Sequence, residues 1–260
     1  MIFAIVNGAR REPEKGLIGN CPSCGNLMIA KCGEKKIHHW SHKGKLECDP
    51  WWENETQWHR NWKGHFPVIW QEVVHKDEVT GERHIADVKT DEEWVIEFQH
   101  SFLRPEERNS RNDFYKKLVW VVDGKRLKGD EVEIKKAIEG GIPFGFTRKI
   151  HPDNCSLLKD WNSNHAVFFD LGQDELIVLL PKCHDEMLYV FPFSKSEFIE
   201  IFQNEGTEKA INFKNLLLNF PKMVLINQIQ IHQRNQLIAN VQQRLNGQRT
   251  RHRARRRFRL

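Results

Sequence analysis

Two carboxylates and an amide stand at regular positions in the central part of the sequence. Glu97 and Gln99 are two residues apart in the apolar run 94–100, so on a strand their side chains point to the same face. Asp87 lies in the preceding run, and Asp87 and Glu97 are each five residues from position 92. A hairpin that turns about this position places the two carboxylates directly opposite each other, with Cβ atoms about 5 Å apart.

Two facing carboxylates suit a hard divalent cation such as Mg²⁺ or Mn²⁺. An ion held by Asp87 and Glu97 would polarise a phosphodiester, activate a water molecule and neutralise the charge that develops during in-line displacement. Gln99 would orient that water, but a neutral amide cannot stabilise hydroxide as a lysine ammonium does. The alternative is that the two carboxylates lie on an ordinary sheet face or pair with Arg83 and Lys89.

A helix predicted over 53–64 brings further polar groups towards this pair. Glu55, His59 and Lys63 follow at four-residue intervals and share one helical stripe. The neighbouring stripe is aromatic and consists of Trp51, Trp58 and Trp62. One side of the helix can therefore pack on the sheet while its polar border reaches the carboxylates, with Glu55 as an additional ligand or a water-binding group. The alternative is a solvent-exposed ladder of i,i+4 side chains.

A second helix is predicted over 105–117, because proline is favoured at the first position of a helix. Arg108, Arg111 and Tyr115 fall on one face of it. They could hold a DNA phosphate or form structural ion pairs.

Cysteine and histidine pairs near the start of the chain have metal-ligand spacing. Cys21 and Cys24 form a CxxC knuckle, and His39 and His42 follow after a loop. Together they predict a tetrahedral Cys₂His₂ site for structural Zn²⁺, which would stabilise a segment too small for a core of its own. Two further thiols, Cys32 and Cys48, could replace either histidine. The alternative is that the thiols are free and the histidines pack elsewhere.

The net charge of +5 comes from the C-terminal end of the chain. The segment 244–260 carries eight Arg and no acidic residue, so the rest of the chain is net negative. We expect the tail, about 249–260, to contact DNA phosphates, while the alternative is a solubilising end without a specific role. The arginines assigned to this contact are Arg251, Arg253, Arg255, Arg256 and Arg257.

The composition is that of a globular protein. Hydrophobic residues make up 39% and charged residues 29% of the chain, and nine Trp and sixteen Phe can fill a core. The sequence contains no convincing secretion signal and no run long enough to cross a bilayer. We therefore expect a cytoplasmic protein with reduced thiols and no membrane partner.

Three regions are predicted, with boundaries near residues 50 and 150: an N-terminal Cys/His module over 1–50, an α/β unit over 51–150, and a C-terminal α+β region over 151–260. The third region is expected to contain a small sheet. Its later part is expected to form helices over about 208–219 and 222–245, the last ending at Gly247.

The motifs of the central region, taken in order, resemble the nuclease domain of the competence protein CoiA family over roughly residues 20–125. The resemblance is carried by Glu55-Thr56-x-x-His59-x-x-x-Lys63, Arg83-x-x-Ala86-Asp87-Val88, Ile96-Glu97-Phe98-Gln99-x-Ser101, Arg111-x-x-x-Tyr115 and the earlier His39-Trp40-Ser41-His42-Lys43. It implies a restriction-endonuclease-like PD-(D/E)XK core in which Asp87 and Glu97 bind metal and Gln99 takes the place of the usual lysine. The chain departs from the family at Trp58, where an acidic residue is common, and in its arginine-rich tail.

Taken together, these features predict a metal-dependent deoxyribonuclease that acts in DNA uptake, recombination or defence, with DNA and other DNA-processing or defence proteins as its partners. The main alternative is a DNA-binding or assembly protein whose nuclease-like domain does not cut, because Gln99 replaces lysine. A third interpretation is an RNA-binding module that uses the knuckle and the tail.

Overall fold

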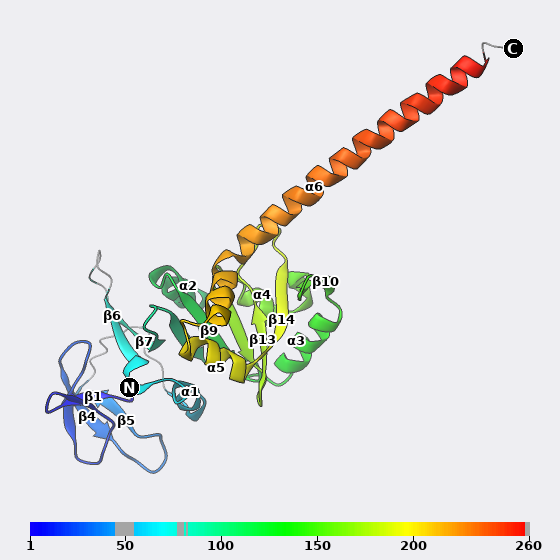
Figure 1. The fold of residues 1–260 in the computed structure, drawn as a ribbon. Helices are drawn as coiled ribbons and strands as arrows, with labels where there is room; N and C mark the ends of the chain where they lie inside the picture. The colour runs from blue at the N-terminus through cyan, green and yellow to red at the C-terminus, as the bar shows by residue number, and fades with distance from the viewer. Residues whose placement is uncertain (45–54, 77–80, 82, 258–260) are drawn as a thin grey trace.

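The computed structural model of the protein describes residues 1–44, 55–76, 81 and 83–257, with side chains in the last segment as far as residue 243. Within these residues the chain forms a mixed α/β structure with two sheets and six α-helices. A small sheet lies at the N-terminal end, a large sheet forms the body, and the last helix extends away from the body (Figure 1).

The N-terminal sheet has five short antiparallel strands in the order β2-β1-β3-β4-β5. The strands are β1 (Ala4–Val6), β2 (Ala9–Arg11), β3 (Ile18–Asn20), β4 (Leu27–Lys31) and β5 (His39–His42). Its buried core consists of Met1, Ala4, Cys21, Met28 and Trp40. A core of this size contributes little stability on its own, so the sheet needs further support.

The large sheet has nine strands in the order β10-β11-β14-β13-β12-β9-β8-β7-β6. The strands are β6 (Gln71–Lys76), β7 (Arg83–Lys89), β8 (Val95–Gln99), β9 (Leu118–Asp123), β10 (Ile142–Phe144), β11 (Thr147–Ile150), β12 (Ala166–Asp170), β13 (Glu175–Leu179) and β14 (Leu188–Ser194). Strands β8, β9 and β12 are parallel to one another, and the remaining neighbours are antiparallel. The parallel strands are buried on both faces, as parallel sheets require.

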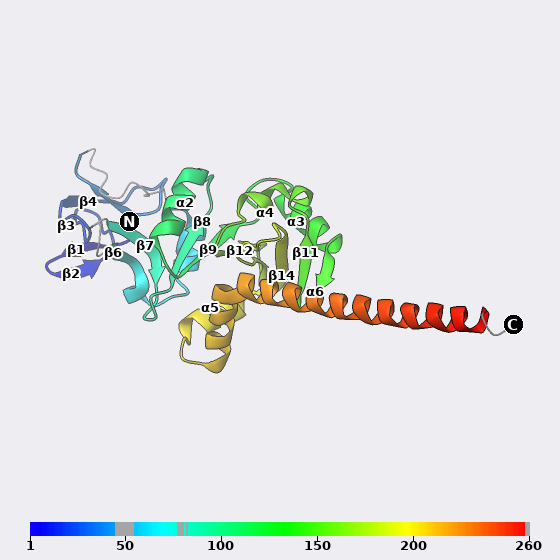
Figure 2. The same cartoon turned by 90° about the horizontal axis from the view of Figure 1, so that it is seen from above.

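Helices cover both faces of the large sheet (Figures 1 and 2). The helices are α1 (Gln57–Lys63), α2 (Pro105–Phe114), α3 (Asp130–Glu139), α4 (Ser156–Asp160), α5 (Lys195–Gln203) and α6 (Glu208–Arg257), with short 3₁₀ turns η1 (Val68–Trp70) and η2 (Pro152–Asn154). Trp62 of α1, Phe198 of α5 and Phe220 of α6 belong to the core on one face. The core on the other face includes Ile134 of α3 and Leu158 of α4, so the body has three layers.

The large sheet continues across the boundary predicted near residue 150. Strand β12 pairs with β9 in parallel, from Ala166 opposite Val119 to Asp170 opposite Asp123. The strands before and after residue 150 therefore bury their apolar side chains in shared cores, and the predicted second and third regions form one body. Sequence patterns indicate which face of a strand is buried, but they do not indicate which distant strand pairs with it. The boundary predicted near residue 150 therefore does not correspond to a division of the sheet.

The two C-terminal helices predicted from the sequence form one continuous helix, α6, with Pro221 in its interior. A proline inside a helix costs about 3 kcal/mol. Leu217, Phe220 and Val224 are buried against the body on either side of it, and this packing holds the helix through the proline. The helix also passes the end predicted at Gly247. No helix in the described part of the chain combines the length and apolar character needed to cross a membrane.

Candidate active site and metal centre

Asp87 and Glu97 lie side by side where strands β7 and β8 meet. The strands pair with Val88 opposite Ile96 and Lys89 opposite Val95, which confirms the register predicted from the turn. At the next pair, Asp87 and Glu97, side-chain carboxylates accept hydrogen bonds from the backbone. The Asp87 N–H donates to Glu97 Oε1 (3.3 Å), and the Phe98 N–H donates to Asp87 Oδ2 (3.0 Å). Each carboxylate is thus fixed by the backbone of the neighbouring strand.

Helix α1 delivers the ammonium group of Lys63 to this pair. Lys63 Nζ lies 2.8 Å from Asp87 Oδ1, and it also contacts Glu55 Oε1 (3.2 Å) and Glu72 Oε1 (3.5 Å). The helix begins with a capping box, in which the Thr56 hydroxyl accepts the His59 N–H and the His59 ring accepts the Thr56 N–H. The cap fixes the start of α1, and Trp62 in the core fixes its rotation, so that Lys63 points to Asp87.

Burial makes these charges depend on one another. Burial alone would lower the pKa of Lys63, but the carboxylates of Asp87, Glu72 and Glu55 outweigh it and raise that pKa well above its usual value. Burial would likewise raise the pKa of Asp87 and of Glu72, and the Lys63 ammonium and backbone N–H donors instead lower both. The cluster is therefore ionised at neutral pH.

Arg111 of α2 contacts Glu97. Its guanidinium donates to Glu97 Oε2 (3.2 Å) and to Glu107 Oε1 (2.6 Å), and its side chain is buried. This matches the structural ion pair that was the alternative to a DNA contact. Gln99 is also buried and donates from Nε2 to the carbonyl and hydroxyl oxygens of Ser101, each at 3.1 Å.

The polar stripe of α1 is not a solvent-exposed ladder, because His59 and Lys63 are buried. Glu55 and Asp87 both contact Lys63, and Glu55 also pairs with Arg60 (3.0 Å). His59 is close enough to favour the ionised form of Asp87 and so to lower its pKa, after the larger effects of burial and Lys63. The alternative partners of the carboxylates lie elsewhere: Arg83 donates to the Ser23 carbonyl, and Lys89 pairs with Glu93.

The carboxylate oxygens of Asp87 and Glu97 are suitable ligands for a hard cation, but each of them already contacts a hydrogen-bond donor or a cationic side chain. The four carboxylate oxygens contact Lys63, the Phe98 N–H, the Asp87 N–H and Arg111, so an ion would use their remaining lone pairs. Glu55 lies beyond Lys63 and does not complete a three-ligand group. Among the described residues, the group of three closely spaced ligand atoms is the Cys/His cluster, not the carboxylates.

The other residues assigned to DNA lie on the second face of the sheet or in the tail. Tyr115 is buried, and the Arg108 guanidinium carbon lies 4.8 Å from the centre of the Trp161 ring. The side chains of Arg251, Arg253, Arg255, Arg256 and Arg257 lie outside the described residues, as do those of Cys48 and Trp51.

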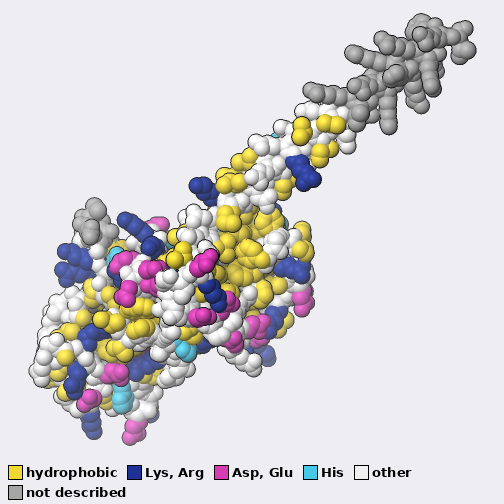
Figure 3. Space-filling view, viewed as in Figure 1, with side chains coloured by type: hydrophobic (Ala, Val, Ile, Leu, Met, Phe, Trp, Pro, Cys, Tyr) yellow, Lys and Arg dark blue, Asp and Glu magenta, His cyan; other side chains and the backbone are white. Residues whose placement is uncertain are grey.

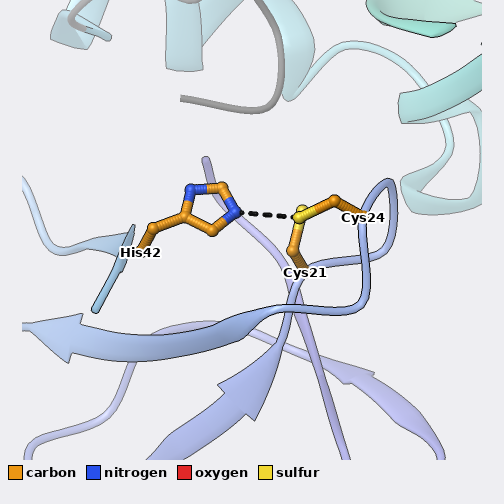
Figure 4. Close-up of side chains that lie close together, drawn as sticks. All are labelled: Cys21, Cys24 and His42. Carbon is orange, nitrogen blue, oxygen red and sulfur yellow. Dashed lines mark hydrogen bonds between the residues drawn. The ribbon is translucent and has the colours of Figure 1, made fainter. Parts of the chain in front are cut away.

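Cys21, Cys24 and His42 form a cluster at the N-terminal sheet (Figure 4). Their ligand atoms all lie within 4.8 Å of one another, and Cys24 Sγ is 3.3 Å from His42 Nε2. The two thiols come from the turn between β3 and β4, which Gly25 closes with a positive φ of 74°. The Asn26 side chain donates a hydrogen bond to Cys24 Sγ (3.2 Å). The three side chains form an incomplete tetrahedral set that fits Zn²⁺.

His39, the fourth ligand predicted, is not part of this cluster. The HxxH pair lies on strand β5, where residues three apart point to opposite faces, so His39 and His42 cannot converge. His39 Nδ1 instead lies 2.8 Å from the Ile37 carbonyl oxygen. Cys32, an alternative ligand, contacts the Pro13 carbonyl. The described residues thus supply three ligands.

Glu72 is a site residue that the sequence did not single out. It is buried at the start of β6, has a φ of +46°, and accepts hydrogen bonds from the Ile2 and Phe3 N–H groups as well as contacting Lys63. The signal in the sequence was weak, a single carboxylate next to the two valines of β6. Its contacts connect the N-terminal sheet to the Asp87–Lys63 cluster.

Comparisons with models of protein families, with curated proteins and with solved structures found no match to this chain.

Proposed function

We propose that this protein is a metal-dependent nuclease that hydrolyses DNA phosphodiester bonds, with a CoiA-like reaction centre at Asp87 and Glu97. The observation that carries the proposal is the position of these two carboxylates on adjacent strands. The Asp87 backbone N–H lies 3.3 Å from Glu97 Oε1, and the Lys63 ammonium lies 2.8 Å from Asp87 Oδ1. Paired carboxylates beside an ammonium are the groups that PD-(D/E)XK chemistry requires.

Asp87 and Glu97 would hold Mg²⁺ or Mn²⁺, which supplies Lewis-acid activation of water and of the phosphodiester when bound. Lys63 provides the positive charge that Gln99 lacks. Its raised pKa keeps it protonated, so in this scheme it stabilises negative charge on the attacking oxygen or the phosphate and does not act as a base. Arg111 holds Glu97 in place, and Gln99 is fixed by Ser101.

The Cys21, Cys24 and His42 cluster would hold structural zinc in the same protein. Zinc would supply the N-terminal sheet with the stability that its small core lacks. Its place in the function is to hold the sheet, and with it the contacts of Glu72 to Ile2 and Phe3, against the body.

The second candidate is a DNA-binding or assembly protein that does not cut. It is favoured by one observation: each oxygen of Asp87 and Glu97 already has a donor, so the cluster is satisfied without an ion. In that case the buried charges stabilise the junction of α1, α2 and the sheet.

Incubating the protein with single-stranded, linear duplex and supercoiled DNA, in Mg²⁺, Mn²⁺ or EDTA, distinguishes the two. The nuclease cuts at least one DNA form, needs the divalent ion, and loses activity in Asp87→Asn. A protein that binds DNA equally well with and without EDTA and never cuts it is the binder.

A further inference from the structure

A cavity of about 380 Å³ lies between the N-terminal sheet and helix α1. It is lined by Met1, Lys35, Lys36, Ile37, His39, Glu55 and Arg60. The segment between β4 and β5 forms one wall, and the residues at the start of α1 form the other. It is separate from the Cys/His cluster, because His39 and His42 point to opposite faces of β5.

The lining of this cavity favours an anion. Lys35 and Lys36 are exposed, and neither forms an ion pair with a carboxylate of the described residues. Glu55 is the carboxylate of the lining, and it already contacts both Arg60 (3.0 Å) and Lys63 (3.2 Å). Arg60 is anchored further by a hydrogen bond to the His38 carbonyl. Cations on two walls, around a neutralised carboxylate, attract phosphate groups.

The cavity lies next to the proposed reaction centre. Glu55 belongs to its lining, and the Lys63 ammonium contacts both Glu55 (3.2 Å) and Asp87 (2.8 Å). A strand whose phosphates occupy the cavity is therefore placed near Asp87. Phosphate contacts position a nucleic acid without reading its sequence.

We propose that this cavity, called the cleft below, binds the phosphodiester backbone of the DNA strand that enters the Asp87–Glu97 centre. Lys35 and Lys36 are its principal phosphate contacts. The inference rests on the proposed function for its substrate. It assigns to the N-terminal sheet the role of guiding the strand.

The test measures binding of a labelled DNA duplex and its single strand, without added Mg²⁺ or Mn²⁺ and without a chelator, by fluorescence anisotropy at several salt concentrations. The background is Asp87→Asn, which prevents cutting. The variant is Lys35→Glu with Lys36→Glu, and the matched control is Lys128→Glu with Lys182→Glu, which makes the same charge change at exposed lysines outside the cleft. Zinc content and thermal unfolding show that both variants are folded.

We expect the cleft variant to bind at least about tenfold more weakly, with a salt slope smaller by about 1.8 for duplex, or about 1.4 for single strand, if each lysine neutralises one phosphate. The control should stay within about twofold of the parent. Equal binding by the cleft variant and the control overturns the proposal, as does single-stranded RNA that competes better than DNA.

The outcomes separate this proposal from the proposed function. If the protein never cuts DNA but its DNA binding depends on Lys35 and Lys36, the proposed binding site is supported and the proposed nuclease activity is contradicted. If Asp87-dependent cutting occurs and the lysine variant changes neither cutting nor DNA binding, the nuclease activity is supported and the binding site is contradicted.

Discussion

The Cys/His cluster and the carboxylate cluster are two polar sites held in opposite ways. The ligand atoms of Cys21, Cys24 and His42 lie within 4.8 Å of one another, and Cys24 Sγ contacts His42 Nε2. Asp87 and Glu97 are each fixed by a backbone N–H and by a cation from a helix. The first cluster is a group of three ligand atoms that could hold a metal ion, whereas the second is a network of paired charges.

This difference predicts how each site depends on metal. Zinc at the first site would be needed for the N-terminal sheet to fold, because few other interactions stabilise that sheet. An ion at the second site would bind a framework that is already formed, so it would change the chemistry and not the fold. The predictions below test that contrast, from the largest expected effect to the smallest.

Removing a ligand of the Cys/His cluster should remove the metal entirely. The wild-type protein should contain about one zinc per chain, and Cys21→Ser and His42→Ala should contain little or none, because two remaining ligands hold zinc poorly. Elemental analysis after chelator-free, reducing purification measures this. Hydrogen exchange over residues 4–42 should rise in both variants.

His39→Ala is the matched control, since His39 has the same side chain three residues away on the opposite face of β5. It should keep its zinc. Loss of zinc in His39→Ala, or full zinc in Cys21→Ser, would contradict the three-ligand cluster and remove the contrast between the two sites.

Removing one charge from the carboxylate pair should abolish cutting without unfolding the protein. Asp87→Asn and Glu97→Gln should each lower the cleavage rate by on the order of 10²–10³-fold, because each keeps its shape and loses an anionic ligand. Glu55→Gln should have a smaller effect, since Lys63 separates it from Asp87. Gln99→Ala should be milder still, and Gln99→Lys should retain activity. Cleavage with Mg²⁺ or Mn²⁺, with calorimetric metal titration, measures these differences.

Glu107→Gln provides the control for this series. Glu107 shares Arg111 with Glu97 but does not contact the pair, so its loss should change the rate by no more than about threefold. Full activity in both Asp87→Asn and Glu97→Gln would exclude this reaction centre.

The arrangement of the strands that carry Asp87 and Glu97 was predicted from the sequence because their pattern is local. The hairpin turn alone placed Asp87 opposite Glu97, and the pairing of β7 with β8 has that register. The prediction that His39 and His42 bind the same metal ion was wrong. Their three-residue spacing would bring the side chains together on a helix or a loop, but on a strand it places them on opposite faces.

Long-range contacts could not be predicted from those patterns. Glu72 meets Ile2 and Phe3 some 70 residues earlier in the chain, and the strands on either side of residue 150 join in one sheet. Helix α6 continues through Pro221 because distant core residues pack against it. Each of these depends on tertiary packing, which local propensity does not report.

Replacing Lys63 should destabilise the network of paired charges at neutral pH. Lys63→Met leaves the carboxylates of Glu55, Glu72 and Asp87 without their shared cation, which should cost about 3–5 kcal/mol of unfolding free energy. Lys89→Met is the control. Lys89 pairs with the exposed Glu93, and a surface pair is worth about 0–1 kcal/mol. Urea unfolding measures both.

The cost of losing Lys63 should shrink in acid. The pKa values of Asp87 and Glu72 are lower in the folded protein than in the unfolded chain. Their contribution to the free energy of unfolding is therefore present above the unfolded pKa of about 4, and it is lost as the pH falls through the lower folded pKa. Lys63→Met removes the main cause of that lowering. The difference between wild type and variant should therefore be smaller at pH 3 than at pH 7, and an equal difference would show that the carboxylates are not charged in the fold.

The smallest effect on the reaction is expected from the arginine-rich end of α6, which lies far from the strands that carry both clusters (Figure 1). The part of α6 just before it exposes apolar side chains (Figure 3). Deleting residues 249–260 removes seven of the eight arginines of this segment. Fewer phosphate charges would then be neutralised, so DNA affinity should fall by about tenfold or more at low salt and the salt slope should decrease by about 0.9 for each lost contact. The rate of cutting at saturating DNA should not change, because no group at Asp87 or Glu97 is altered.

This prediction distinguishes a tail that binds DNA from one that only keeps the protein in solution. Replacing the same arginines by lysine is the control, because lysine keeps the charge that contacts phosphate and should preserve the salt slope. If deletion lowers the cutting rate at saturating DNA, the tail must reach the reaction centre, and the centre would then not be only the network of Asp87, Glu97, Lys63 and Arg111. If the slope is unchanged by deletion, the tail does not contact DNA, and the cleft beside α1 must supply the phosphate contacts.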